Sequence, residues 1–166
     1  MPKVQVHMKG IDDASKKLNK FIKKIPNITL PGLIKCAIIL QRSMDKESPT
    51  VPADTRNLQS SFFIVTTKSV AEGGSPKFEG DDAGQMASNH TRTIQSGKSK
   101  VETSRFPMIM LGFSANYAEW MHEKMDIKHY TRAGSGAKFF ESAIARNTQK
   151  MLAVLTKEVK EGIKNE

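Results

Sequence analysis

Histidine and carboxylate side chains cluster in the second half of the chain, where His122 and Glu123 are adjacent and Asp126 and His129 follow. All are ligand types that bind divalent metals, so one hypothesis is a metal-dependent hydrolase using His122, Glu123 and His129. The metalloprotease helix, however, requires a second histidine four residues after the first, and position 126 is Asp. Because the spacing matches no recognised motif, the residues more simply indicate surface or hydrogen-bonded structural side chains.

Sequence patterns for covalent and phosphate chemistry are not evident. Gly134-Ser135-Gly136 lacks the strand-turn-helix context of a nucleophile elbow, and Gly73-Gly74 is too short for a phosphate loop. Asp81-Asp82 is a carboxylate pair within a polar stretch, where burial is hard to arrange. The sequence therefore predicts a protein that is not an enzyme, with no cofactor, no metal and no catalytic residues.

The densest apolar run is Phe106 to Phe113, which predicts a strand buried on both faces. Asn116 and Glu119 have capping-box spacing, so a helix is expected to begin there. Tyr117 and Trp120 then share one face of that helix. Such a pair could stack a ligand, but aromatic residues at helical spacing usually belong to a core or an interface.

The net charge of +9 is concentrated near the N-terminus, since residues 1 to 46 hold ten Lys or Arg against three Asp. Five of these lysines fall on one predicted helix and form a basic contact face. It could meet DNA phosphates, an acidic protein surface or only water. No base-reading motif accompanies the charge, so contact with DNA would be to its backbone. The five lysines are Lys16, Lys17, Lys20, Lys23 and Lys24.

The remaining pattern predicts an α+β fold. Strands are expected at Val4–Met8 and from Ser60 to Thr67, and helices from about residue 12 to Ile25, where Pro26 stops it, from about 30 to 45 and from 137 to 164. Residues 69–104 are polar and predict an extended loop or arm inserted in a single domain, 1–166. We thus expect a small, mostly antiparallel sheet of about three to four strands, packed against two N-terminal helices and a long C-terminal helix.

Smaller signals complete this interpretation. Cys36 lies among apolar residues and is expected to be a small buried hydrophobe. Gly162 is expected to mark fraying near the end of the last helix. No apolar run approaches the roughly 20 residues that a membrane span needs, and the N-terminus lacks the apolar centre of a signal peptide, so synthesis in a cytoplasm is expected.

Four stretches, taken in order, carry a family resemblance. They are the opening strand with Gly10 and the lysine-rich helix, residues 52–61 (PADTRNLQSS), residues 112–123 (GFSANYAEWMHE) and residues 137–143 (AKFFESA). In this order and spacing the sequence resembles the phage head-tail joining proteins. These are the tail-completion or neck proteins of long-tailed phages, also described as minor capsid or minor tail components.

The sequence departs from the family pattern at two places. Arg56 stands where the family usually has Gly, and because a side chain disfavours positive φ, a turn of different shape is expected. The 69–104 stretch is also longer than the family leads us to expect.

The resemblance implies a virion structural protein without enzymatic activity, made in the bacterial host cytoplasm and located in the phage neck. It would form a homo-oligomeric ring, twelve-fold or six-fold, between the portal-adaptor and the tail terminator or tail tube proteins. The ring would line the DNA channel and touch DNA without sequence specificity, away from any membrane. The alternative is a basic nucleic-acid-binding protein without enzymatic activity. Expected interface residues are Asp54, Thr55, Arg56, Tyr117, Trp120, His122, Glu123, Phe139 and Phe140.

Overall fold

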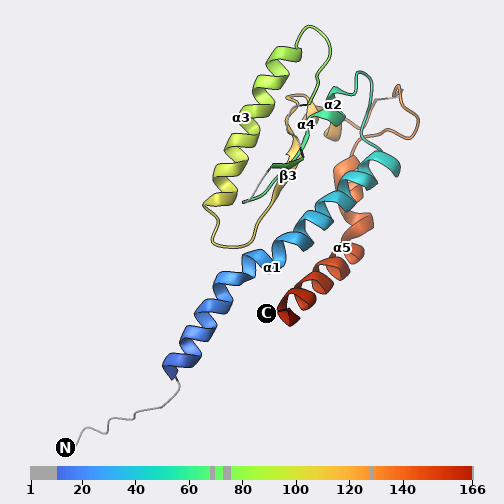
Figure 1. Ribbon diagram of the computed structural model, residues 1–166. Coiled ribbons are helices and arrows are strands. Elements are labelled where there is room, and N and C mark those ends of the chain that lie inside the picture. Colours follow the sequence, from blue (N-terminus) through green and yellow to red (C-terminus); the bar gives the residue numbers. More distant parts are fainter. Residues whose placement is uncertain (1–10, 68–69, 73–75, 128, 166) are drawn as a thin grey trace, which may run out of the picture.

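Helices enclose a small sheet in the computed structural model, which describes residues 11–67, 70–72, 76–127 and 129–165. Two long helices, α1 (Ile11–Lys46) and α5 (Phe139–Lys164), run antiparallel along one side (Figure 1). Helix α3 (Ala83–Glu102) lies on the other side of the sheet. Two short helices, α2 (Asn57–Ser60) and α4 (Ala118–Glu123), sit near one end. The expected Val4–Met8 strand lies outside the described residues.

The sheet is antiparallel with the order β2-β1-β3, from β1 (Phe62–Val65), β2 (Val70–Glu72) and β3 (Met110–Phe113). Strand β1 pairs with β3 over four residues, from Phe62 opposite Phe113 to Val65 opposite Met110. Because β2 is only three residues long, β1 and β3 make up most of the sheet. The α+β class, the small antiparallel sheet and the long last helix are confirmed.

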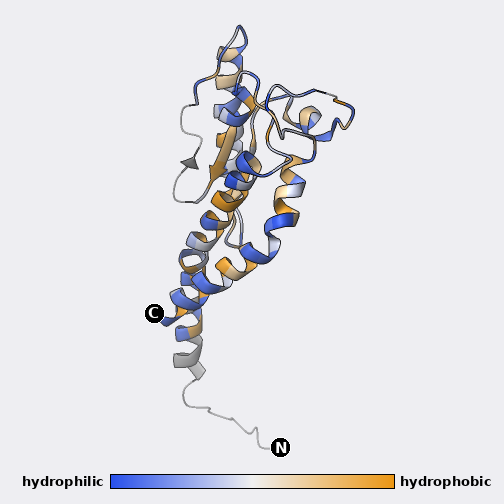
Figure 2. Ribbon diagram, turned by 90° about the vertical axis from the view of Figure 1, so that its right-hand side faces the viewer, coloured by the Kyte–Doolittle hydropathy of each residue, from blue (hydrophilic) through white to orange (hydrophobic). Residues whose placement is uncertain are grey.

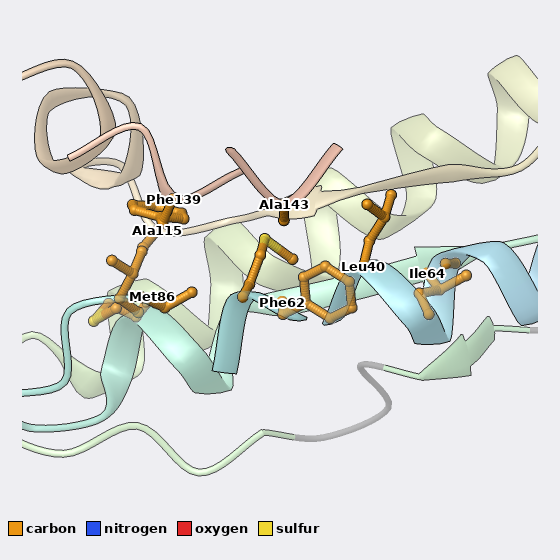
Figure 3. Close-up of a cluster of buried hydrophobic side chains, with 11 residues drawn as sticks. Leu40, Phe62, Ile64, Met86, Ala115, Phe139 and Ala143 are labelled. Atoms are coloured by element: carbon orange, nitrogen blue, oxygen red, sulfur yellow. The ribbon is translucent and has the colours of Figure 1, made fainter. Parts of the chain in front are cut away.

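Strand β1 is the strand buried on both faces. Phe62 and Ile64 belong to the larger core cluster with α1 and α5, whereas Phe63 and Val65 pack with Val101 of α3. Figure 3 shows the side chains of the larger cluster meeting between the helices and β1, and Figure 2 shows the hydrophobic strand ribbon inside the molecule. This alternation follows from the period-2 direction of strand side chains.

The assignment of that role to Phe106–Phe113 was wrong. Only Met110 to Phe113 form a strand, its side chains are half-buried, and Phe106 is 78% exposed. Before the strand, the Ser104 hydroxyl donates to the Phe106 carbonyl and accepts from its N–H. Since Pro107 has no N–H to give a ladder, this local turn replaces the first half of the expected strand.

The two predicted N-terminal helices are one helix, α1, with Pro26 and Pro31 inside it. A proline within a helix removes one hydrogen bond and costs roughly 3 kcal/mol. Near Pro26 the Thr29 hydroxyl donates to the Ile25 carbonyl at 2.9 Å, which adds a local bond but does not replace the one that the Ile22 carbonyl loses. The C-terminal part of α1 is also held by α5, whose packing offsets the cost.

The α1–α5 contact is closest at two glycines. A Cβ on Gly162 would lie 2.4 Å from Ile28 Cγ2, and one on Gly32 would lie 2.8 Å from Leu155 Cδ1. The Cys36 thiol, half-buried in the same contact, donates to the Met151 carbonyl at 3.4 Å, and burial raises its pKa. Gly162 is therefore a close-packing position, and the expectation that it marks fraying was wrong.

The expectation of a loop or arm over residues 69–104 was wrong for most of that stretch. Residues 83–102 form α3, which buries Met86, His90 and Val101 against the rest of the molecule. These residues, with Ile94 and Gly97, lie four, four, three and four residues apart, which is one face of a helix. Because two of the five positions are His and Gly, the apolar stripe is hard to see in the sequence.

The first half of helix α5 buries a row of three residues one turn apart. Phe139, Ala143 and Asn147 are buried, whereas Ile144 is exposed. Asn147 is polar but its burial is satisfied, because its side-chain amide donates to the Ala143 carbonyl at 2.9 Å. Among the described residues no helix is long and apolar enough to cross a bilayer.

Candidate functional site

Three of the stretches that carry the family resemblance meet around α4. The Ser114 N–H donates to the Ser61 carbonyl at 3.0 Å, which joins the 112–123 stretch to the 52–61 stretch. The Lys138 N–H donates to the His122 carbonyl at 2.8 Å, which joins it to the 137–143 stretch. Segments more than fifty residues apart in sequence thus form one end of the molecule.

Helix α4 borders a groove on each side. On one side Tyr117 and Met121 face the loop before and through α2 across a groove that we call the loop-side groove. Burial raises the pKa of the Tyr117 hydroxyl, and the Asp54 carboxylate raises it further. The loop-side groove is completed by Pro52, Asp54, Thr55, Arg56, Asn57 and Leu58.

On its other side α4 faces the start of α5 across a second groove, here called the apolar groove, with a volume of about 230 Å³. Phe139 at its base is buried, and its ring meets the Phe113 and His122 rings edge-on at 5.5 and 5.0 Å between centroids. Its walls come from Leu111, Phe113, Ala118, Phe139 and Phe140, with His122 and Glu119 at the edge.

An ionic cluster lies beside the apolar groove. Lys138 forms an ion pair with Glu123 and a second with Glu141 at 3.4 Å. The hydrogen bond from Lys138, with help from His122, holds the pKa of Glu123 below its usual range, and the same bond raises the pKa of Lys138. His122 Nδ1 lies 2.7 Å from Glu123, and its Nε2 accepts from the Glu141 N–H at 3.5 Å. The His122 ring is thus held at both nitrogens.

Trp120 does not share the environment of its expected partner Tyr117. The Tyr117 ring packs against the core, whereas Trp120 is 53% exposed with the Lys124 ammonium 4.5 Å from its ring centroid. The expected capping box is also wrong, because α4 begins after Tyr117 without a side-chain cap. Exposure of a large aromatic side chain on the helix that borders both grooves is typical of a binding surface.

Arg56 and Lys138 both adopt left-handed backbone conformations, with φ of 60° and 58°. Each immediately precedes a helix, α2 for Arg56 and α5 for Lys138. We expected a turn of different shape because arginine disfavours positive φ. Arg56 nevertheless adopts the positive φ that a glycine would permit, so that reason for a different shape was wrong. Backbone strain of about 1–3 kcal/mol persists only where the surrounding structure imposes it.

Polar contacts fix the connection between α4 and α5 to the end of α1. Arg132 donates to the Asp45 carboxylate at 3.0 Å and to the Asp45 carbonyl, and Gln59 donates to the same carboxylate at 3.0 Å. Thr131 donates to Asp54 at 3.3 Å. These contacts hold the loop that carries Asp54 against the rest of the site.

The basic residues lie far from α4, on the N-terminal part of α1, which projects beyond the end of α5 (Figure 1). Lys16, Lys17, Lys20 and Lys23 are exposed there, and Lys24 is half-buried. The structure therefore separates the two predicted contact surfaces, one at each end of the molecule.

The metal hypothesis receives no support from the geometry. Of the proposed ligands, His122 and Glu123 are in contact, but Glu123 is committed to Lys138. His129 is exposed. Within the described ranges no three His, Cys, Asp or Glu side chains are grouped so that they could hold a metal ion.

One polar contact was missed by the sequence analysis. The buried His90 of α3 places Nδ1 2.7 Å from the Ser114 hydroxyl, and its ring lies edge-on to Phe63 and Phe78. The pair connects α3 to the end of β3. Only the helical spacing of His90 with Met86 and Ile94 could have indicated its burial.

No family model, curated protein or solved structure matches this chain.

Proposed function

We propose that this protein is a structural component of a tailed-phage virion, a neck or head-tail connector subunit of the tail-completion type. The supporting observation is the meeting of three family-like stretches around α4, the helix that borders both grooves and carries the exposed Trp120. A joining protein acts by binding its neighbours through its surface. The α4 end offers an apolar groove and an ionic cluster beside it for such contacts.

In this proposal the protein forms a ring between the portal-adaptor and the tail terminator or tail tube proteins, and the ring surrounds the DNA channel. Contacts between identical subunits of a ring are head-to-tail, which requires two different surfaces on each subunit. The α4 end and the basic part of α1 supply two such surfaces at opposite ends of the molecule (Figure 1).

Electron microscopy of a phage with an early stop codon in this gene tests the proposal. We expect DNA-filled or emptied heads lying apart from finished tails, and joined infectious particles when the intact gene is supplied in trans. A matched pair of variants, Trp120→Ala and Phe106→Ala, removes an exposed aromatic at the α4 end or away from it, and only the first is expected to reduce joining. Normal infectious particles from the stop-codon phage would contradict the proposal.

A second candidate function, non-specific DNA binding, is favoured by the lysines of α1. Each lysine that meets a phosphate contributes about −0.9 to the slope of log K against log salt concentration. Replacing Lys16, Lys20 and Lys23 by Glu is expected to flatten that slope, whereas replacing Lys157 and Lys160 on α5 is not. No binding to duplex DNA at low salt would exclude this function, and binding that does not depend on salt would exclude the lysines of α1 as its contact face.

A further inference from the structure

An amphipathic segment of α1, residues 16–25, extends past the point where α5 ends; we call it the arm. Leu18 and Ile22 are 59% and 51% exposed, although they lie one helical turn apart on one side. The row continues through Ile25 to Ile28 and Gly32, which α5 covers with Gly162 and Leu155. The arm thus extends a helix-packing face for which the described residues supply no cover.

The arm is also uniformly basic. Between Ala14 and Met44 the sequence contains no Asp or Glu, and the exposed lysines of the arm lie beside and behind the apolar row. A surface that covers Leu18 and Ile22 would therefore need an apolar centre and an acidic edge.

The apolar groove has both properties. Its walls are aliphatic and aromatic, and it is open enough to admit side chains from one face of a helix. Beside it stand the exposed carboxylates Glu119, Glu123 and Glu141. Lys138 pairs with the last two, so this edge keeps an excess of negative charge that Glu119 carries unpaired with Lys138. Helices that dock in grooves do so through apolar residues one turn apart, with flanking charges that fix the orientation.

We propose that the arm of one subunit docks in the apolar groove of a second copy of this chain. The inference rests on the proposed ring and supplies its subunit contact. Because the arm and the groove lie at opposite ends of the molecule (Figure 1), the contact joins different surfaces and leaves a free arm and a free groove on every pair. Such a head-to-tail contact forms a ring when the rotation between neighbouring subunits closes, as the proposed neck ring requires.

Two variants test the contact by sedimentation velocity on the purified full chain. The arm variant carries Leu18→Glu and Ile22→Glu, and the rim variant carries Glu119→Lys and Glu141→Lys; all four side chains are exposed, so folding should be retained. The wild type is expected to sediment as oligomers, and each variant alone near the chain mass of 18.4 kDa.

The mixture of the two variants gives the sharper result. The intact arm of the rim variant fits the intact groove of the arm variant, but neither remaining surface can continue the chain. The mixture is therefore expected to form a species of twice the 18.4 kDa chain mass and nothing larger. Leu152→Glu on α5, where the leucine is 58% exposed, is the matched control and should assemble like the wild type.

Several outcomes would overturn the contact. A wild type that stays monomeric at the highest concentration and low salt excludes it. A rim variant that assembles normally indicates contacts between two arms, and loss of assembly in Leu152→Glu alone moves the interface to α5. If a variant is misfolded by circular dichroism, Lys20→Glu with Lys23→Glu replaces the arm variant. Sedimentation of the purified chain and microscopy of the stop-codon phage are separate experiments. The arm–groove contact can therefore fail its test while the joining function passes, and the joining function can fail while the contact is found.

Discussion

At the scale of single residues, Arg56 has a strained backbone conformation. Its φ of 60° lies in the left-handed region, where a side chain is disfavoured and glycine is not. We predict that Arg56→Gly raises the free energy of unfolding by about 0.5–1 kcal/mol, because relief of the backbone exceeds the added entropy of the unfolded chain. Urea unfolding followed by circular dichroism measures the change.

Two control variants separate the backbone effect from loss of the side chain. Arg56→Ala keeps a Cβ at positive φ and should give no gain. Lys138→Gly relieves a similar φ of 58° but loses the ion pairs to Glu123 and Glu141, so its gain should be smaller. A stabilised Arg56→Ala would show that the arginine side chain, and not its backbone, carries the cost.

The Glu123–Lys138 pair predicts a pH dependence of stability. Because the folded-state pKa of Glu123 is lowered by its hydrogen bonds, its contribution is present above the pKa of the unfolded carboxyl. It is lost as pH falls through the lowered folded value. In Glu123→Gln the fall in melting temperature on acidification should therefore be shallower than in the wild type.

Glu119→Gln is the control, since Glu119 lies on the same helix as Glu123. Its fall in melting temperature on acidification is compared with that of Glu123→Gln. The raised pKa of Lys138 acts in the opposite pH range: its contribution is complete below the unfolded pKa of lysine and is lost as pH rises through the folded value. If the melting temperature of Glu123→Gln falls on acidification as steeply as that of the wild type, the ion pair does not form in solution.

At the scale of elements, the α1–α5 pair depends on close approach. Gly162→Ala gains roughly 0.5–1 kcal/mol of helix propensity, but its Cβ would meet Ile28 Cγ2 at 2.4 Å, and overpacking costs about 1–3 kcal/mol. The overpacking term is larger, so we predict a lower melting temperature. Combination with Ile28→Ala should recover part of the Gly162→Ala loss in a double-mutant cycle.

Gly84→Ala is the matched control for this prediction. Gly84 is exposed in the first turn of α3, and a Cβ there would have no atom within 4 Å. It should stabilise the protein, because only helix propensity changes. Independent, additive effects of Gly162→Ala and Ile28→Ala would mean that the two side chains do not meet.

The elements differ in how far sequence could predict them. Strand β1 was predictable because four adjacent β-branched and aromatic residues leave few alternatives. Helix α3 was not, since its buried row includes His90 and Gly97, whose burial depends on Ser114 and on the neighbouring sheet. The continuity of α1 through Pro26 likewise depends on tertiary packing, which local propensity does not contain.

The candidate site was predictable in its members more than in its arrangement. The family-like stretches indicated Asp54, Tyr117, His122 and Phe139, but not that α4 would divide them between two grooves. Nor could spacing show that Trp120 is exposed while Tyr117 packs against the core. Those differences arise from which side of a six-residue helix meets α5.

At the scale of the whole molecule, the body and the arm are energetically separable. Leu18 and Ile22 are exposed, whereas Ile28 and Leu30 are buried, so the boundary between arm and body lies near Pro26. We predict that deletion of residues 1–24 changes the melting temperature by no more than a few degrees, because the side chains that the structure describes in this segment are exposed or half-buried.

A deletion that extends to residue 32 should behave differently. It removes the buried Ile28 and Leu30 and takes Ile28 and Gly32 away from Gly162 and Leu155 of α5, so it should lower the melting temperature strongly. The shorter deletion should also prevent self-association while its groove still binds a chain with an intact arm. A large loss of stability in the 1–24 deletion would mean that the arm packs on its own subunit, and the head-to-tail contact would then lose the free surface on which it depends.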